Sequence, residues 1–432
     1  MKILKDKGIF AFICSNKFAK AKYGEQLRKL ILENQLKIFN DFTGINVFKE
    51  ASVDTCVIQI KKEFMGKNEV FVDDTYYMEQ SRLDSNSFIF NSPDVLNLRE
   101  KISHDGTPIK DLDIEINRGI LTGFNEAFII DEKTKNRLIK EDSNNKEVIK
   151  PILRGRDINK WRIINKHLYL LYIPWNFKIN NYPSIKNHLN NFKEKLSERP
   201  EVKNERYDWY CMSRYASDYV DLFEKEKIIY SEIVPEPRFV YDDNKYYMEA
   251  TGFILNSIEI NLKYLVSLLN SKLLFWYFKD IGYNLGGKGF RYKKIFIEQL
   301  PIKTTDSYTE NILADLIDQI LLYNKNFVEE TDSFQEFLIE MMDVQKISTK
   351  LENYFNLSLN RFLKEVKKQN GNINDENLKD SLIKRYKYSC EKLKQLQSDI
   401  LILETKMNKM IYSIYNLNEE EIEIIETDLE NI

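Results

Sequence analysis

Cysteine and histidine are scarce in this chain, and each scarcity argues against a class of site. The 432 residues contain only four cysteines (Cys14, Cys56, Cys211 and Cys390), and no two of them form a C-x-x-C pair. A disulfide framework and a zinc knuckle are therefore not indicated, and this usage favours a reducing cytoplasm. None of the three histidines has metal-ligand spacing, so we predict no metal site.

Motifs for phosphate and acyl chemistry are absent as well. The sequence contains no G-x-G-x-x-G, no G-x-x-x-x-G-K-[ST] and no G-x-S-x-G. The tetrapeptide Asn91-Ser92-Pro93-Asp94 resembles Asn-Pro-Pro-Tyr only superficially, because it lacks the second proline and the aromatic residue. We interpret it as the start of a helix. The residues themselves therefore predict no catalytic centre.

Long hydrophobic runs are also missing, and the charge is unevenly distributed. No segment has the length and apolarity of a membrane span or of a signal peptide, which predicts a cytoplasmic protein without a membrane partner. Residues 101–300 carry 33 Lys and Arg against 28 Asp and Glu, whereas residues 301–432 carry 16 against 25. The middle of the chain is thus the part whose charge suits a nucleic acid, although a solvated surface of mixed charge gives the same count.

Hydrophobic patterning predicts three segments, 1–65, 66–303 and 304–432. The first has α/β character, with a doubly apolar strand at 9–13, a helix from Tyr23 and strands at 35–42 and 52–61. A strand apolar on both faces is typical of the middle of a sheet covered by helices on both sides. The second segment mixes strands at 168–174, 228–231 and 238–241 with a helix at 262–278.

The third segment is predicted to be helical and to end in an acidic tail. Apolar residues from Leu393 to Ile414 recur at steps of three and four, the pattern of a helix packed on another helix. Gly371, between two asparagines, marks a turn that joins two antiparallel helices. This spacing alone does not say whether the helix packs within the chain or on a second protein.

Three stretches resemble a known family. GIFAFICSNKFAKAKYGEQLRKLIL, followed by INVFKEASVDTCVIQIKK, resembles the second half of the methyltransferase fold in adenine-N6 DNA methyltransferases, especially the type IIG enzymes fused to restriction endonucleases. INRGILTGFNEAFIID with IKPILRGRDINKW, and EATGFILNS with GGKGFRYKKIFIEQLPI, resemble the TaqI-like target-recognition domain of the same enzymes. The resemblance implies a partial methyltransferase sheet, then a mixed α+β recognition domain and a helical segment.

The resemblance also implies what the chain needs from elsewhere. In that family the S-adenosylmethionine loop and the Asn-Pro-Pro-Tyr loop precede the strand that begins here at Ile9. We therefore expect double-stranded DNA as a partner, together with a catalytic half supplied in cis or in trans, and no S-adenosylmethionine bound by this chain alone. Two alternatives stay open: a non-enzymatic specificity subunit acting in trans, and a non-functional remnant.

Nine residues are candidates for contact with DNA. By resemblance, Phe48 stacks on the target adenine after the base is flipped from the duplex, although it is equally an ordinary core aromatic. The other candidates carry cations or amides beside glycines, which suits phosphates and base edges, while tight turns and local ion pairs are the alternatives. They are Arg118, Asn125, Arg154, Arg156, Lys288, Arg291, Lys293 and Lys294. The rings of Phe290, Tyr292 and Phe296 are interleaved with the last four cations, and we expect them to be available to DNA.

Overall fold

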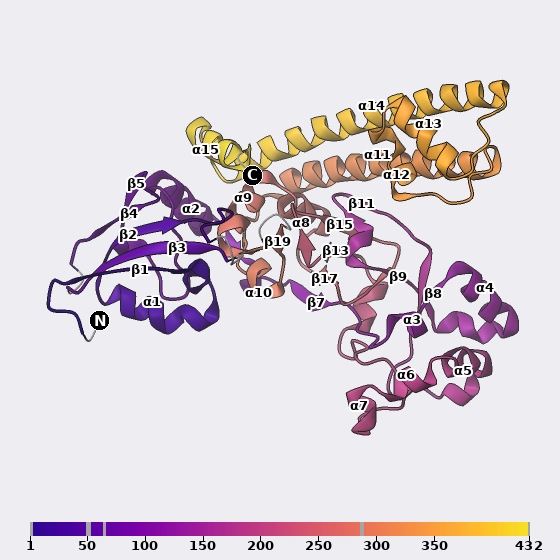
Figure 1. The fold of residues 1–432 in the computed structure, drawn as a ribbon, viewed down its shortest axis with the longest axis horizontal. Coiled ribbons are helices and arrows are strands. Elements are labelled where there is room, and N and C mark those ends of the chain that lie inside the picture. The colour runs from indigo at the N-terminus through magenta and orange to yellow at the C-terminus, as the bar shows by residue number, and fades with distance from the viewer. Residues whose placement is uncertain (1–2, 49–52, 64–65, 286–288, 431–432) are drawn as a thin grey trace.

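The computed structural model describes residues 3–48, 53–63, 66–285 and 289–430, and a five-stranded sheet comes first in the chain (Figure 1). Its strand order is β1-β3-β2-β4-β5, with β3 antiparallel to both β1 and β2, and β4 parallel to β2. The strands are β1 (Ile9–Ser15), β2 (Gln35–Asp41), β3 (Thr55–Lys61), β4 (Glu69–Val72) and β5 (Tyr76–Glu79). Helix α1 (Glu25–Leu32) connects β1 to β2, and α2 (Pro93–Asp105) leads away from the sheet.

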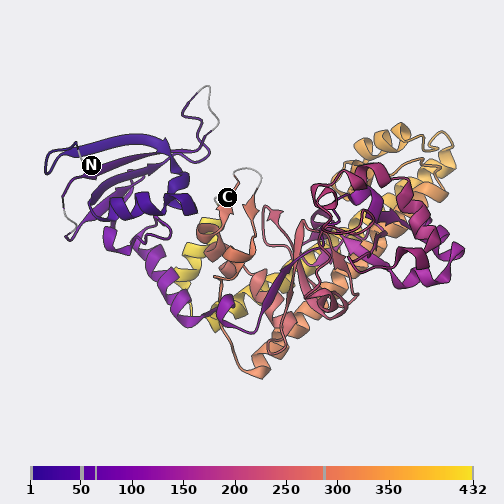
Figure 2. The same cartoon turned by 90° about the horizontal axis from the view of Figure 1, so that it is seen from below.

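The sheet extends beyond the boundary predicted at residue 65. Strands β4 and β5 form a short hairpin, and β4 adds to the sheet beside β2. Each of these strands has only four residues, which gives little alternation for a sequence pattern to reveal. Helix α2 begins at Pro93 with Ser92 as its N-cap, which confirms the helix start predicted there. Figure 2 shows this helix joining the N-terminal sheet to the rest of the chain.

Strand β1 lies at an edge of the sheet, which corrects the expectation of a central strand. Phe10 and Cys14 pack against the core of the sheet on one face. Ile9, Phe12 and Ile13 are exposed, with 56%, 53% and 39% of their surface accessible. Among the described residues no strand pairs with the outer edge of β1. The apolar run of this strand is therefore buried only in part.

Two four-stranded sheets form the middle of the chain. One has the order β15-β13-β17-β7 and is antiparallel; the other has the order β16-β9-β12-β8. Their strands are β7 (Glu115–Arg118), β8 (Ile129–Asp131), β9 (Ile149–Leu153), β12 (Leu168–Leu171), β13 (Lys227–Ser231), β15 (Phe239–Asp242), β16 (Tyr247–Met248) and β17 (Gly252–Asn256). The strands predicted at 168–174, 228–231 and 238–241 are thus confirmed.

Strand β13 is buried along its whole length because both of its faces are covered. Ile228 and Tyr230 belong to a core shared with helices, whereas Ile229 belongs to a core shared with the second sheet. At one end of β13 the ammonium group of Lys227 lies 2.6 Å from the carboxylate of Asp242, and both side chains are fully buried. A buried charge of this kind requires its partner, so the pair fixes the register between β13 and β15.

Short strands and helices complete the middle of the chain. The strands are β6 (Thr107–Pro108), β10 (Ile158–Asn159), β11 (Arg162–Ile163), β14 (Ile233–Val234), β18 (Tyr283–Asn284), β19 (Phe290–Arg291) and β20 (Pro301–Ile302). The helices are α3 (Asn125–Phe128), α4 (Glu132–Glu141), α5 (Pro183–Asn190), α6 (Lys193–Ser197), α7 (Pro200–Lys203), α8 (Leu262–Leu269), α9 (Lys272–Ile281) and α10 (Lys294–Ile297).

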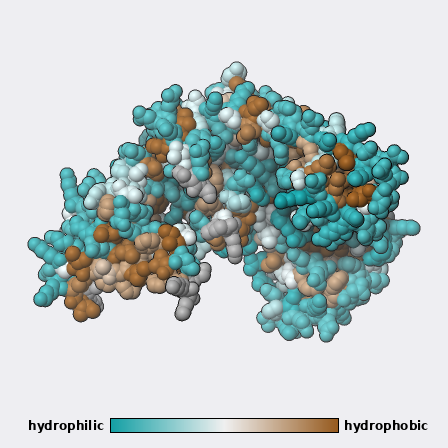
Figure 3. All heavy atoms as spheres, turned by 45° about the horizontal axis from the view of Figure 1, so that its top comes forward, coloured by the Kyte–Doolittle hydropathy of each residue, from teal (hydrophilic) through white to brown (hydrophobic). Residues whose placement is uncertain are grey.

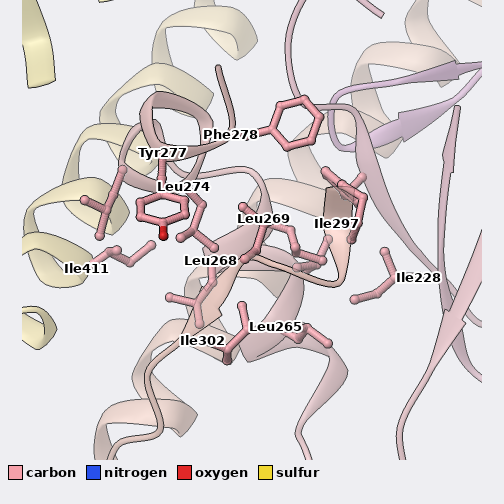
Figure 4. Close-up of a cluster of buried hydrophobic side chains, with 14 of the residues drawn as sticks. Ile228, Leu265, Leu268, Leu269, Leu274, Tyr277, Phe278, Ile297, Ile302 and Ile411 are labelled. Atoms are coloured by element: carbon pink, nitrogen blue, oxygen red, sulfur yellow. The ribbon is translucent and has the colours of Figure 1, made fainter. Parts of the chain in front are cut away.

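The helix predicted at 262–278 is two helices, α8 and α9. Asn270 leaves the helix and bonds both backbone groups of Phe239, and the Ser271 hydroxyl caps α9 by accepting from the Leu274 N–H. Because the apolar spacing continues across this break, the sequence pattern does not reveal that Ser271 caps a new helix. Figure 4 shows side chains of both helices, among them Leu265, Leu269 and Leu274, converging in one core.

A pair of long helices forms the last part of the chain. Helix α11 (Ser307–Glu340) and helix α14 (Glu376–Ile414) run side by side, and α12 (Thr349–Glu352) and α13 (Leu359–Lys368) pack at one end of the pair (Figure 1). Leu393 and Met407 of the predicted apolar seam are buried within the chain. The turn at Gly371 exists, but it joins α13 to α14, and the long partner of α14 is α11.

The acidic end of the chain is a packed helix, α15 (Glu419–Glu430). Trp276 of α9 donates its indole N–H to Asp428 at 2.8 Å, and Lys101 of α2 pairs with Glu421 at 2.6 Å. Much of the negative charge in this segment is therefore engaged by the middle of the chain. Within the residues described, no helix combines the length and apolarity needed to cross a bilayer.

Candidate nucleic-acid interface

Five segments that are distant in the sequence meet around the turn that precedes β17. The segments are 118–125, 154–157, 231–232, 249–252 and 289–291, and we call them the loop cluster. The N–H of Gly119 donates to the carbonyl oxygen of Gly252 at 2.9 Å, and the N–H of Glu232 donates to that of Thr251 at 3.0 Å. The N–H of Gly155 donates to the hydroxyl of Thr251 at 2.9 Å. The structure thus brings together three motifs that the sequence presents separately.

Two glycines allow this close approach. A Cβ on Gly119 would lie 2.2 Å from the carbonyl oxygen of Glu249, which no side chain can tolerate. Gly123 has a φ of +80°, and a Cβ there would lie 2.1 Å from the Ser213 hydroxyl. Both glycines are therefore required by the close packing of this loop.

Arg118 and Arg291 share one carboxylate in the loop cluster. The Arg118 guanidinium donates to the carbonyl oxygen of Ala250 at 2.8 Å and to Glu232 at 3.1 Å, while its side chain remains 54% exposed. The Nε of Arg291 lies 3.6 Å from the other oxygen of Glu232. Because one carboxylate faces two guanidinium groups, the three side chains together keep a net positive charge. Hydrogen bonds fix Arg118, whereas Arg291 has only the longer ion-pair contact and its buried Nε has no hydrogen-bond partner.

Asn125 is fixed by a separate set of hydrogen bonds. Its side-chain oxygen accepts from the Thr122 hydroxyl at 2.6 Å, and its NH₂ group donates to Glu249 at 3.3 Å. Glu249 in turn accepts from the Thr251 hydroxyl. Asn125 begins the helical turn α3. The amide therefore belongs to a network that shapes the loop cluster.

Arg154 and Arg156 are neighbours in the sequence with different surroundings. Arg154 donates from Nε and Nη2 to the two oxygens of Asp157, both at 3.0 Å, and Asp157 is buried. The side chain of Arg156 is exposed, and its guanidinium has no hydrogen bond or ion pair within the described part of the chain. The local ion pair foreseen as the alternative thus forms at Arg154, which leaves Arg156 as the available cation.

The basic segment around Arg291 is partly explained by packing. Phe290 and Tyr292 are 5% and 2% exposed, and Tyr292 stacks on Phe278 of α9 with ring centroids 4.1 Å apart. These two rings belong to the core, which corrects the expectation that they are available to DNA. Lys293 is exposed, and Lys294 is exposed with its ammonium 3.6 Å from Glu298. Lys288 lies outside the described residues.

Phe48 lies on the N-terminal sheet, apart from the loop cluster. It follows β2 in the connection to β3 and is 43% exposed. At the same end of the sheet, Asn16 and Asp54 line a hollow of about 350 Å³, and Lys279 and Tyr283 line it from the opposite side. The ring is therefore not a core aromatic, and its loop leaves the sheet beside the junction with α9.

Several residues that support the loop cluster were not identified from the sequence. Arg199 is 8% exposed and donates to the carbonyl oxygens of Thr122, Leu196 and Trp209. The Tyr219 hydroxyl donates to the Arg118 carbonyl oxygen at 3.0 Å. Burial lowers the pKa of Arg199 and raises that of Tyr219, so the guanidinium group is costly to bury and the phenol stays neutral. No spacing rule marks these residues.

Metal ligands do not gather in the described residues: no group of three or more His, Cys, Asp or Glu there is arranged to hold an ion. Besides the carboxylates of Asp157, Glu232 and Glu249, the polar side chains of the loop cluster are cations, amides and hydroxyls. Groups of these three kinds can donate to phosphate oxygens and base edges.

Comparison with known proteins defines the class of this surface. Residues 150–302 match the TaqI-like C-terminal specificity domain, and residues 306–411 match a domain of unknown function, DUF8810. The chain therefore contains a TaqI-like specificity domain, and most of the loop cluster falls within it.

The relatives are enzymes of bacterial restriction-modification systems. The type II methyltransferase M.BstVI of Geobacillus stearothermophilus is 19% identical over 369 residues, which cover 76% of this chain and 64% of the relative. The restriction enzyme and methyltransferase RM.Eco57I of Escherichia coli is 22% identical over 71% of this chain and 36% of its own length. The chain thus spans less than two thirds of the length of these relatives.

Two solved structures align with most of the chain at low sequence identity. The type IIL restriction-modification enzyme MmeI in complex with DNA aligns over 90% of this chain and 50% of its own, with 12% identity and a TM-score of 0.48. The type IIG restriction endonuclease BpuSI aligns over 89% and 48%, with 12% identity and a TM-score of 0.36.

Proposed function

We propose that this chain recognises a specific sequence in double-stranded DNA as part of an adenine-N6 DNA methyltransferase of a restriction-modification system. The match of residues 150–302 to a specificity domain is the single observation that carries the proposal. The loop cluster supports it, because it presents Arg118, which is fixed by hydrogen bonds, beside Arg291 and the exposed cation Arg156. Fixed donors lose little entropy when they bind phosphates or base edges.

The proposed residues divide into two roles. Arg118 and Arg291 both face Glu232, and hydrogen bonds fix Arg118 in a defined orientation. We assign both arginines to base edges, since Arg pairs with guanine through two hydrogen bonds. Arg156, Lys293 and Lys294 are exposed cations and suit the phosphate backbone. Asn125 and Arg154 hold the shape of the loop cluster rather than contact DNA. Phe48, exposed on the other side of the junction, stacks on the flipped adenine.

Residues of the first sheet form the C-terminal part of a methyltransferase domain in this proposal. Strands β1 and β2 run parallel, with α1 as their connection and the reversed strand β3 between them. The exposed apolar edge of β1 suits pairing with a further strand, and Figure 3 shows apolar side chains gathered on this end of the molecule. A catalytic half placed there, in cis or in trans, would cover that surface.

S-adenosylmethionine supplies the methyl group in the complete enzyme of this proposal. The turns after the parallel strands β1 and β2 begin with Asn16-Lys17-Phe18 and Phe42-Thr43-Gly44, and neither is the glycine-rich loop that lets backbone N–H groups approach such a cofactor. The described residues therefore do not fit the cofactor. We assign to this chain no step of methyl transfer and no cofactor site.

Selection from a pool of randomised DNA duplexes tests the proposal. The complete 432-residue chain is mixed with the pool, and bound duplexes are recovered, amplified and sequenced. We expect one enriched motif, bound about a thousandfold or more tightly than unrelated duplexes at equal salt. Binding without an enriched motif, or no binding, would contradict the proposal. Methyl transfer from S-adenosylmethionine by the isolated chain would contradict the assignment of catalysis to another half.

A specificity subunit acting in trans is the second candidate, because the open edge of β1 would accept a separate chain as readily as a covalently joined half. An edge with three exposed apolar residues is a natural contact for a separate chain. Co-expression with a separately encoded catalytic half distinguishes the two. A stable complex with methylation activity supports assembly in trans, whereas activity only after covalent fusion supports a single chain.

A further inference from the structure

Helix α13 has an unusually clean division between its two faces. The residues buried towards the helix pair are Phe362 and Val366, with Leu359 and Leu363 packed against the same core. The opposite, exposed face carries Arg361, Lys364, Lys367 and Lys368. These positions recur at steps of three and four and therefore point the same way from the helix.

The four cations of α13 have no acidic partner. Glu365 is the only acidic residue of this helix, and it is buried, where it accepts from the Ser348 hydroxyl at 2.7 Å. Within the described residues none of the four cations forms an ion pair or a side-chain hydrogen bond. Exposed helix faces usually carry charges of both signs. This face carries only positive charges, more than it needs to remain solvated.

The charge of this face also differs from that of its surroundings. Helix α13 carries one Arg and three Lys against a single, buried Glu, although residues 301–432 as a whole carry 16 Lys and Arg against 25 Asp and Glu. Positive charge is thus gathered on the exposed face of α13, at the end of the helix pair where α12 and α13 pack (Figure 1). Since the apolar face of α13 is buried, the helix cannot insert into a membrane, and its partner must be recognised by charge alone.

We propose that this face of α13 binds the phosphate backbone of DNA that flanks the recognised sequence. The inference rests on the proposed function, which places a duplex against the loop cluster. An ion pair of 2.8 Å between Lys166 and Glu352 ties the α12–α13 end to the segment that follows Arg156. Phosphates of one strand are spaced at intervals that a row of helical cations can follow, and each neutralised phosphate releases a counterion.

Duplexes of two lengths test this inference in the complete chain. The short duplex contains the selected sequence alone, and the long one adds about 15 base pairs on each side, matching the length of α11 at about 50 Å. The variant replaces Arg361, Lys364, Lys367 and Lys368 with Gln. On the long duplex, a fourfold rise in salt should weaken the unmodified protein about 100-fold more than the variant. On the short duplex the two proteins should bind alike.

A matched variant and competitor complete the test. Lys387, Lys394, Lys406 and Lys409 are exposed on α14, and their replacement by Gln removes the same charge from another surface, so we expect no dependence on duplex length. The inference would be overturned if the α13 variant and the unmodified protein showed equal salt dependence on the long duplex. It would also be overturned if the variant lost affinity equally for the short and the long duplex. The inference would also be overturned if double-stranded RNA, but not double-stranded DNA, competed for binding to the α13 face. Sequence preference on the short duplex tests the proposed function separately, whichever result α13 gives.

Discussion

Arg154 and Arg156 illustrate at the residue scale how neighbouring cations acquire different roles. Arg154 neutralises a buried carboxylate, that of Asp157, whereas Arg156 extends into solvent. The two side chains have the same chemistry and lie two positions apart in a turn. Their surroundings, and not their type, therefore decide which of them is available to a ligand.

We predict that Arg156→Ala affects DNA binding and that Arg154→Ala affects stability. Arg156→Ala should weaken binding of the selected duplex by about 1–3 kcal/mol and leave the free energy of unfolding within about 0.5 kcal/mol. Arg154→Ala leaves the Asp157 carboxylate buried without its cation and should lower the free energy of unfolding by about 1–3 kcal/mol. Urea unfolding and titration with labelled DNA measure the two quantities. Equal effects of both substitutions on DNA binding would contradict the division of roles.

Phe48 offers a second test at this scale. Because the ring is 43% exposed, Phe48→Ala should change the free energy of unfolding by no more than about 0.5 kcal/mol. In the complete enzyme the same substitution should weaken capture of the flipped base by about 1–3 kcal/mol, and Phe48→Trp should retain it. The fluorescence of 2-aminopurine at the target position reports base flipping. A large loss of stability in the isolated chain would instead make Phe48 a packing residue.

At the element scale, one buried carboxylate joins the two long helices. Glu330 of α11 is 5% exposed and accepts hydrogen bonds from Ser389 at 2.7 Å and from Lys392 at 2.8 Å, with Arg385 also bonded to it. All three donors lie on α14. Burial raises the pKa of Glu330, whereas these hydrogen bonds together lower it by more than burial raises it. The pKa of Glu330 in the folded protein therefore lies below its ordinary value.

Glu330→Gln should therefore lower the free energy of unfolding by about 1–3 kcal/mol near neutral pH. Glu329→Gln is the matched control, because Glu329 is 63% exposed and its substitution should cost less than about 0.5 kcal/mol. The folded-state pKa of Glu330 is depressed, so its contribution is present above pH 4.5, its ordinary pKa, and is lost as pH falls through the folded value. The difference between the two proteins should shrink in acid. A difference that stays constant down to acid pH would show that the charge is not responsible.

The break between α8 and α9 shows what limits prediction at this scale. Apolar spacing across residues 262–278 indicated one helix, and the side chains do bury as that spacing implies. The break results from Asn270, whose side chain forms hydrogen bonds with the backbone of Phe239 in strand β15. A tertiary contact thus overrides a local pattern, and no local pattern could have announced it.

At the scale of the whole molecule, the outer edge of β1 is the surface that the proposed function assigns to contact with the catalytic half. Ile9 and Ile13 lie on one face of the strand and Phe12 on the other, and all three are exposed. Burying an isoleucine is worth about 1.5–3 kcal/mol, so each of these residues can contribute measurably to assembly. The open edge is common to both forms of the proposal, in cis and in trans.

Ile13→Glu should weaken association with a separately produced catalytic half about 10- to 100-fold, because the substitution places a charge in the contact. Binding of DNA by the isolated chain should not change, since the loop cluster is on other elements. Ile258→Glu is the control, as Ile258 is 94% exposed and lies away from β1. Analytical ultracentrifugation of the mixed halves measures the association. Equal weakening by both substitutions would remove β1 from the contact.

Elements whose signal is local could be located from the sequence. Apolar and β-rich runs located β1, β2, β3 and β13, and helical spacing located the apolar seam of α14. The resemblance of the sequence to a recognition domain also anticipated the match at residues 150–302. Each of these features depends on residues within a few positions of one another.

Only the tertiary structure decided which residues meet. It joined five distant segments into the loop cluster, placed two arginines beside Glu232, buried Phe290 and Tyr292, and left β1 at an edge. Contacts between segments far apart in sequence depend on how sheets pair and pack, and residue spacing carries no record of that pairing. The chemistry that we propose to face DNA is therefore encoded in the residues of this chain but arranged by its fold.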